Sequence, residues 1–324
     1  MRWLCAVALG LWLLAAGCGG SDAREGANSD DAALENMLAF APARTGDDYR
    51  IAYTNWRAIA RAMDLDVDTA EQATDLLVRV GEQGAPFAAQ VPSKLWHQSD
   101  VVWEGQVGPA GAPVFAVALR DGVEFDRIVD TLDGCGLAAS ARREATVFDG
   151  SLRDMARCAG RFGTDVPLFG HIAVLPDRGV VLMAQDADQL NSALESDGDV
   201  ASDDDVVGLA DALGSAQSLV LDLGDACRSG IAAGLVYGAE DGAGRIALRY
   251  PDADTAKKDA AARERALSEG RSAMAHRPYS DVLDVYDVKV DDDTVVLSVH
   301  PPVKGLPLPL NEMYQQRDLA FAGC

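Results

Sequence analysis

Carboxylates at alternate positions in one segment suggest a calcium site as the first candidate for chemistry. The run Asp-Leu-Asp-Val-Asp at residues 64–68, with Asp75, places carboxylates at positions 1, 3, 5 and 12 of a calcium-binding loop, which needs hard oxygen ligands. Position 6, however, is Thr69 where the loop requires glycine, and an aspartate at position 12 is too short for bidentate coordination. A helix start explains the same residues, because Asp68 can cap it and Glu71 can complete a capping box. We therefore expect no metal site in this segment.

Motifs for nucleophilic, zinc or nucleotide chemistry are absent from the sequence. It contains no Gly-x-Ser-x-Gly nucleophile elbow and no Gly-Lys-Ser/Thr phosphate loop. Residues 134–139 have nominal Gly-x-Gly-x-x-Ala spacing, but they follow an expected helix, whereas a dinucleotide-binding fingerprint follows a strand. The four histidines lie in separate segments without zinc-site spacing: His97, His171, His276 and His300. We expect no catalytic residue, metal or cofactor. The alternative, an enzyme whose motif is not recognised, would bring polar groups together around His97 or His171.

The first eighteen residues have the layout of a secretory signal. Arg2 precedes an apolar run from Trp3 to Ala16, and small residues lead to Cys18. As a helix the run would rise only about 21 Å at roughly 1.5 Å per residue, short of a hydrocarbon core of roughly 30 Å. We therefore expect a cleaved signal peptide over residues 1–17 and not a transmembrane helix.

Small residues followed by cysteine, Leu14-Ala15-Ala16-Gly17-Cys18, resemble the lipobox of bacterial lipoproteins. Ala15 stands where that family prefers leucine, and the resemblance covers this segment alone, so it says nothing about the fold. It implies cleavage before Cys18 and a diacylglyceryl group on its thiol, with palmitate as an acyl chain. Two acyl chains would give stable attachment, so the expected location is the extracytoplasmic face of the cell membrane. Residues 18–47 would be the lipidated cysteine and a flexible tether. The alternative is an ordinary signal peptide with a chance cysteine.

Composition and charge exclude several partners. The chain of 324 residues is 48% hydrophobic, which is enough to bury a core, and its formal net charge is −23. Such an acidic surface argues against nucleic acid as a partner and against electrostatic adhesion to anionic lipid, so the membrane attachment would come from the lipid. Most of the positive charge is arginine, and with abundant Ala, Gly and Asp the composition resembles that of an actinobacterial-type lipoprotein.

The cysteine count depends on the signal peptide. If Cys5 is removed with the signal and Cys18 carries lipid, four cysteines remain: Cys135, Cys158, Cys227 and Cys324. An even number in an oxidising compartment predicts two disulfides, and four cysteines allow three connectivities. We favour Cys135 with Cys158 and Cys227 with Cys324, because each pair lies within one half of the chain.

The residues between these features predict strands and amphipathic helices in alternation. A strand, a turn and a helix follow one another over residues 48–63, 114–132, 180–194 and 246–267. Residues 171–184 and 282–299 predict hairpins, so the expected fold is α+β, with largely antiparallel sheets and helices packed on one face. Aromatic residues concentrate between positions 49 and 103, where they would form either core or a binding platform.

The acidic run over residues 195–205 divides the globular part. It is either a seam between two similar halves, residues 48–200 and 201–324, or a solvated loop inside one continuous domain.

These observations favour a lipid-anchored cell-envelope protein that acts as a binding or scaffolding module and is not an enzyme. The alternatives are a carrier of an apolar ligand and an extracytoplasmic hydrolase. A carrier would need an internal cavity lined by the helix stripes, which are the apolar residues at helical spacing such as Ile59, Ile128 and Leu132.

Overall fold

The computed structural model describes residues 32–46, 48–67, 69, 72, 95–151, 153, 154, 158, 169–224, 227–238, 243–273 and 275–300. The predictions for the signal peptide, the lipidated Cys18, the first part of the tether, Asp68, Glu71, Asp75 and Cys324 lie outside these residues.

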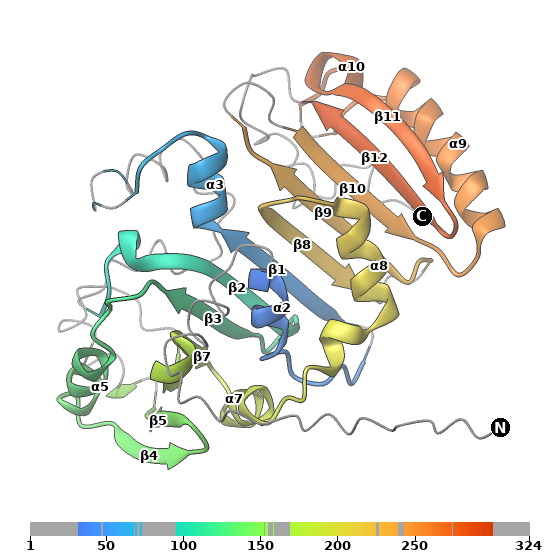
Figure 1. Ribbon diagram of the computed structural model, residues 1–324. Coiled ribbons are helices and arrows are strands. Elements are labelled where there is room, and N and C mark those ends of the chain that lie inside the picture. Colours follow the sequence, from blue (N-terminus) through green and yellow to red (C-terminus); the bar gives the residue numbers. More distant parts are fainter. Residues whose placement is uncertain are drawn as a thin grey trace, which may run out of the picture.

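One antiparallel sheet of twelve strands organises the described residues (Figure 1). Its strand order is β11-β12-β10-β9-β8-β1-β2-β3-β7-β6-β5-β4. The strands are β1 (Tyr49–Asn55), β2 (Val101–Pro109), β3 (Val114–Leu119), β4 (Ala138–Arg142), β5 (Ala145–Asp149), β6 (His171–Leu175), β7 (Val180–Ala184), β8 (Ser218–Leu223), β9 (Gly230–Val236), β10 (Ala243–Arg249), β11 (Asp284–Asp291) and β12 (Thr294–His300). The predicted antiparallel α+β class is confirmed.

The strand order contains one arrangement twice. The meander β1-β2-β3 is followed by helix α5 (Phe125–Asp133), and β7 later pairs with β3. The meander β8-β9-β10 is followed by helix α9 (Ala253–Glu269), and β12 later pairs with β10. The two meanders meet at the antiparallel pair β1–β8, where Ile51 lies opposite Leu221. The two halves of the chain therefore share one sheet and have a similar topology.

Helices cover both faces of the sheet, which corrects the prediction of one covered face. Helices α3, α5, α9 and α10 contribute to one buried cluster, and α2, α7 and α8 to the other. The remaining helices are α2 (Ala33–Leu38), α3 (Trp56–Ala62), α7 (Ala187–Leu194), α8 (Asp204–Leu213) and α10 (Tyr279–Val282), with short 3-10 turns η3 (Gln98–Asp100), η4 (Pro176–Arg178) and η5 (Asp199–Ser202). Among the helices described, none has the length and apolar character needed to cross a bilayer.

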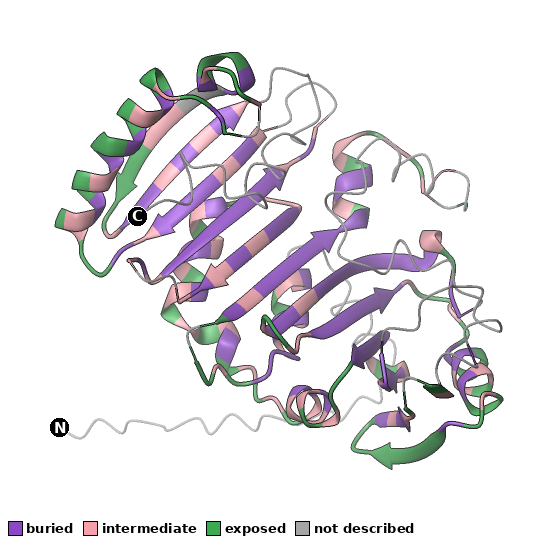
Figure 2. Ribbon diagram, turned by 180° about the vertical axis from the view of Figure 1, so that it is seen from behind, coloured by how far each residue is buried: buried purple, intermediate pink, exposed green. Residues whose placement is uncertain are grey.

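Strands with unbroken apolar runs explain why both faces need a cover. In β3, Phe115, Val117 and Leu119 pack into the α5 side, whereas the alternate residues Val114 and Ala116 pack into the α7 side. Successive side chains of a strand point to opposite faces, so a strand that is apolar throughout has to be buried twice. Figure 2 shows the result: the central strands are buried almost throughout, and the outermost strand β4 is exposed.

Side-chain caps begin three of the helices in the segments where the sequence predicted a helix. The Asn55 side chain accepts a hydrogen bond from the Ala58 N–H at the start of α3, and Asp186 and Asp252 cap α7 and α9 in the same way. A capping box also forms near residue 70, but between Thr69 and Gln72, whose side chains and backbone exchange hydrogen bonds of 2.9–3.3 Å.

The acidic run over residues 195–205 contains the start of a helix that was not predicted from the sequence. Residues Asp199–Ser202 of this run form η5. The Asp203 side chain then accepts hydrogen bonds from the N–H groups of Asp205 and Val206 at the start of α8. Helix α8 packs on β8, β9 and β10, with Leu209 fully buried. The run therefore connects α7 to a helix that is part of the shared core.

Gly105 in β2 allows the N-terminal helix α2 to approach the sheet. A Cβ atom at this position would lie 2.5 Å from the Ala52 carbonyl oxygen and closer still to Met37 Sδ. Replacing Gly105 with alanine should lower the free energy of unfolding by about 1–3 kcal/mol, because neither backbone nor a fully buried methionine can move aside without strain.

Chemical denaturation of the Gly105→Ala variant measures this loss. Gly111→Ala is the matched control, because no atom lies within 4 Å of its Cβ position. Equal midpoints for the two variants would show that α2 does not pack against β2 as described.

Candidate functional site

A histidine and an aspartate form the described pair that most resembles catalytic machinery. His171 Nδ1 and Asp149 Oδ1 are 2.7 Å apart, directly opposite each other on β6 and β5. A carboxylate in this position can orient an imidazole for general base catalysis. Within the described ranges, however, Asp149 is the side chain that His171 contacts by hydrogen bond, and no hydroxyl or thiol reaches its other ring nitrogen. The pair therefore acts as a cross-strand link at the end of the sheet.

The other histidines lie apart from His171 in the fold. His97 precedes η3, where the Asp100 side chain accepts from the His97 N–H at 2.7 Å. His276 lies after α9, and His300 ends β12. Over the part of the chain that the structure describes, no group of three His, Cys, Asp or Glu side chains could hold a metal ion.

A row of buried polar side chains crosses the centre of the sheet. Glu104, Thr54 and Ser218 occupy facing positions on β2, β1 and β8. The hydroxyls of Thr54 and Ser218 are 3.1 Å apart, and the Trp56 indole N–H donates to Glu104 Oε1 at 2.9 Å. All three are nearly inaccessible to water, so these hydrogen bonds offset the cost of removing polar groups from solvent.

Ion pairs connect the segment before β1 with α8, β10 and the β11–β12 turn. Arg44 Nη1 lies 3.3 Å from a carboxylate oxygen of both Asp203 and Asp205. Arg249 Nε lies 3.3 Å from Asp205, and its Nη2 lies 3.3 Å from Asp293. Because both arginines share Asp205, the two ends of the described chain meet in one network.

Tyr49 lies beside this network. Its hydroxyl donates to the Pro42 carbonyl oxygen at 2.6 Å. Burial raises the pKa of Tyr49, and the nearby Asp203 carboxylate adds to the rise, so the hydroxyl remains a donor at physiological pH. The hydrogen bond fixes the chain that leads into β1.

Gly208 makes room for the network inside α8. The Arg249 guanidinium passes so close to Gly208 that a Cβ atom there would collide with Nη1. Glycine within a helix costs about 1 kcal/mol relative to alanine, so it calls for a reason such as this one. No role for Arg249 was predicted from the sequence. A glycine inside a helix, Gly208, could have indicated that another group approaches the helix closely at this position.

Two surface depressions border these polar groups. One is lined by Ala41, Ala43, Asp188, Asn191, Ser192, Glu195, Ser196, Asp197 and Asp199. The other is lined by Ser202, Asp203, Asp204, Asp205, Ser229, Arg249, Tyr250, Pro251 and Asp293. Neither contains a residue of the apolar helix stripes, and both are too polar for an apolar ligand.

The stripes and aromatic residues considered for ligand binding are packed into the core. Ile59, Ile128 and Leu132 are fully buried in the cluster under α3 and α5. Trp56 and Trp103 are buried as well, on opposite faces of the sheet. The side chains that a carrier would use to line a cavity therefore already contact one another.

The two edges of the sheet differ in exposure. Among the described strands, β4 pairs with β5 alone, and all of its residues, Ala138–Arg142, are exposed. At the other edge, β11 carries the paired side chains Lys289 and Asp287 and contains a β-bulge after Val285. Charges and bulges of this kind prevent pairing with another chain, so β11 is a protected edge and β4 is an open one.

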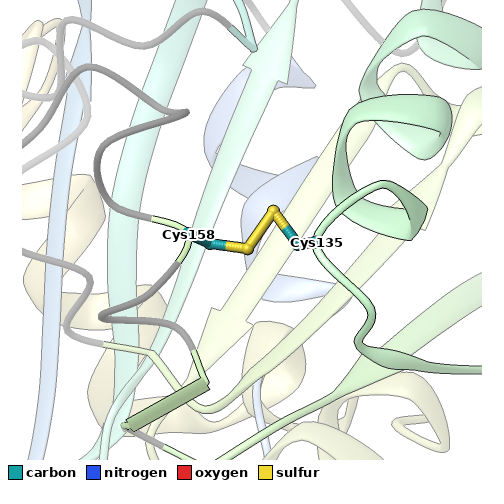
Figure 3. Close-up of a disulfide and its surroundings, with 2 residues drawn as sticks. All are labelled: Cys135 and Cys158. Atoms are coloured by element: carbon teal, nitrogen blue, oxygen red, sulfur yellow. A yellow bond between two sulfur atoms is a disulfide. The ribbon is translucent and has the colours of Figure 1, made fainter.

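A disulfide joins the chain just before β4 to a separate segment. Cys135 and Cys158 have an S–S distance of 2.05 Å and a Cα–Cα distance of 5.6 Å (Figure 3). This is the first of the two pairs that the sequence favoured. Cys227 is also disulfide-bonded, while Cys324, the partner expected for it, lies outside the described residues.

Comparisons with known proteins add little to this description. No family model and no curated protein matches the chain. Among solved structures, the chain is similar to crystal form IV of TP0453, with 8% sequence identity and a TM-score of 0.34, over 84% of this chain and 94% of that one. Similarity at this level supports no statement about function.

Arg249 is the residue through which the ion-pair network can be tested. Arg249→Met keeps most of the side-chain length but removes the pairs with Asp205 and Asp293 and the hydrogen bond to the Asp204 carbonyl oxygen. Because these groups are about a quarter exposed, the expected loss in the free energy of unfolding is about 1–2 kcal/mol, measured by urea titration. Lys289→Met, on a lysine that is 74% exposed, should change the midpoint much less. Similar losses for both variants would contradict the network.

The disulfide before β4 should stabilise the folded chain. Cys135 and Cys158 are 23 residues apart, for which the loop-entropy model gives about 3 kcal/mol. The double variant Cys135→Ala/Cys158→Ala should melt at a lower temperature than the unreduced wild type. Thiol titration of the folded wild type, which should detect neither cysteine, is the control. An unchanged melting temperature would mean that the bond contributes nothing.

Proposed function

We propose that the protein is a lipid-anchored binding or scaffolding module of the cell envelope, held on the extracytoplasmic face of the membrane by a diacylglyceryl group on Cys18. The membrane would be contacted through this lipid, since a chain of net charge −23 is repelled by anionic lipid and by nucleic acid.

The observation that carries the proposal is the packing of the N-terminal segment, residues 33–44, against the rest of the fold. Met37 and Phe40 are buried against the sheet, and the Ser196 hydroxyl donates to the Ala41 carbonyl oxygen at 2.7 Å. The hydrogen bond from Tyr49 to Pro42 and the ion pairs of Arg44 continue this attachment. Residues 33–44, which lie between the proposed lipid and β1, are thus built into the body, as expected of a chain that positions a module.

The length of the tether follows from this attachment. We predicted a tether over residues 18–47, but α2 (Ala33–Leu38) packs against the sheet, so the part that could span the distance to the membrane ends by Ala32. Fully extended, the 15 residues 18–32 would reach about 50 Å at roughly 3.5 Å per residue. The proposed anchor would hold the body no farther than this from the bilayer surface.

The disulfides support an extracytoplasmic location. Bonds such as Cys135–Cys158 form and persist in oxidising compartments and are rare in the reducing cytosol.

A binding role is favoured over catalysis by what the described polar groups already do. His171 and Asp149 link two strands, Glu104 accepts from Trp56, and Arg249 joins α8 to the β11–β12 turn. Each is engaged in holding elements together, which is the arrangement of a rigid scaffold. In the described residues, no observation of this kind favours an apolar-ligand carrier or a hydrolase.

Replacing Cys18 with alanine tests the anchor. Metabolic labelling with palmitate should be lost, and the protein should be either released from the membrane or retained as the uncleaved precursor. Cys5→Ala, a substitution inside the proposed signal peptide, should label like the wild type. Continued labelling of the Cys18→Ala variant would refute the anchor.

A further inference from the structure

Within the described part of the chain, strand β4 ends the sheet, and no strand pairs with its outer backbone edge. It pairs with β5 from Ala138–Asp149 to Arg142–Ala145 without a register shift, and its five residues are all exposed. The outer side of such a strand presents N–H and C=O groups that can pair with another extended chain. Four of the five side chains are alanine or serine, so little bulk stands in the way of an incoming strand.

The strand is also fixed in position at both ends. Three residues before it, Cys135 is joined to Cys158. At its other end the Arg142 guanidinium donates to Asn191 Oδ1 on α7, and Arg143 Nη1 donates to the Leu194 carbonyl oxygen at 2.9 Å. The arginines therefore lie against α7 and leave the backbone edge clear. A strand that is already ordered loses little conformational entropy when it binds, which favours association.

The contrast with β11 indicates that the open edge is not a general property of this sheet. At β11 the charged side chains Asp287 and Lys289 and a bulge after Val285 obstruct pairing, and α9 and α10 pack beside the strand. The same chain thus protects one edge of the sheet and leaves the other free. Unprotected edges invite strand addition, and native proteins retain them where a partner is to be bound.

We propose that β4 is a docking strand that accepts a cationic extended segment of a partner protein by β-strand addition. The inference rests on the proposed binding function and names the surface and the class of partner. The net charge of −23 attracts a segment rich in lysine and arginine and repels a second copy of the chain, and the cationic groups next to the edge, Arg142 and Arg143, are bound to α7. The main chain of β4 would supply the hydrogen bonds, and the small side chains of Ala139 and Ala141 would accommodate larger partner side chains above them.

The test uses the full mature chain and the acetylated, amidated peptide (Lys-Val)4, with (Glu-Val)4 as the charge-reversed peptide. Titration should show binding of (Lys-Val)4 and at least tenfold weaker binding of (Glu-Val)4. Amide hydrogen exchange should slow at least tenfold within residues 138–142 at saturating (Lys-Val)4, which is the signature of a paired strand edge and not of loose electrostatic attraction.

A matched pair of variants separates the edge from overall charge. Ala139→Lys/Ala141→Lys adds two charges on exposed positions of β4 and should weaken (Lys-Val)4 binding at least tenfold. Val207→Lys/Val290→Lys adds the same charge at two exposed valines on α8 and β11 and should weaken it by less than threefold. Circular dichroism spectra like that of the wild type establish that both variants are folded.

Unchanged hydrogen exchange in residues 138–142 at saturating (Lys-Val)4 would overturn the proposal, and so would equal weakening of (Lys-Val)4 binding in the two variants. A dimer that the Ala139→Lys/Ala141→Lys variant abolishes would also overturn it, because a second copy would then be the occupant. Lipid labelling at Cys18 is measured separately. Loss of peptide binding with intact labelling would therefore refute the docking strand alone, and loss of labelling would refute the anchor alone.

Discussion

The antiparallel pairing of β1 with β8 is the constraint on which the rest of the sheet depends. It joins residues more than 160 positions apart and unites the two meanders. A slip of one residue would turn Tyr49, Ile51 and Tyr53 from the α8 side to the opposite face. It would also separate the buried hydroxyls of Thr54 and Ser218, each of which would then lack its partner. Apolar patterning and a polar pair thus fix one register.

The ion pairs of Arg44 and Arg249 reinforce the same union at the margin of the sheet. Asp205 contacts both arginines, one from the segment before β1 and one from the end of β10. The central strand pair and this network lie at separate points along the junction, so the two halves are held against rotation as well as separation. Such a body suits a module that presents one fixed edge to a partner.

Local features of the fold were predictable from the sequence, and its long-range arrangement was not. Helices α3 and α7, capped by Asn55 and Asp186, lie in segments predicted to contain a helix, because capping and helical periodicity depend on neighbours in the chain. The strand order could not be predicted, because the pairs β1–β8 and β3–β7 join segments that are distant in the sequence.

The covering of both sheet faces could have been predicted from β3, because every residue of this strand is apolar. Strand β4 is mostly alanine and strand β9 is rich in alanine and glycine, so neither has the composition that indicates a strand. Helix α8 was not predicted because it begins within the acidic run, although the spacing of Val206, Leu209 and Leu213 is helical. Of the candidate site, the sequence indicated His171 and the Cys135–Cys158 pair, whereas Arg249 and the open edge emerge only from the assembled sheet.

The burial of the N-terminal segment constrains the order in which the chain can fold. Ala41 is bonded to Ser196, 155 residues later, and Arg44 to Asp203, 159 residues later. During synthesis these two contacts therefore cannot form until more than half of the polypeptide has been made. Contacts of such sequence separation slow folding, so α2 would be among the last elements to settle. Until then the space beside Gly105 that receives Met37 stays unfilled, and apolar surface of the sheet is exposed in the incompletely folded chain.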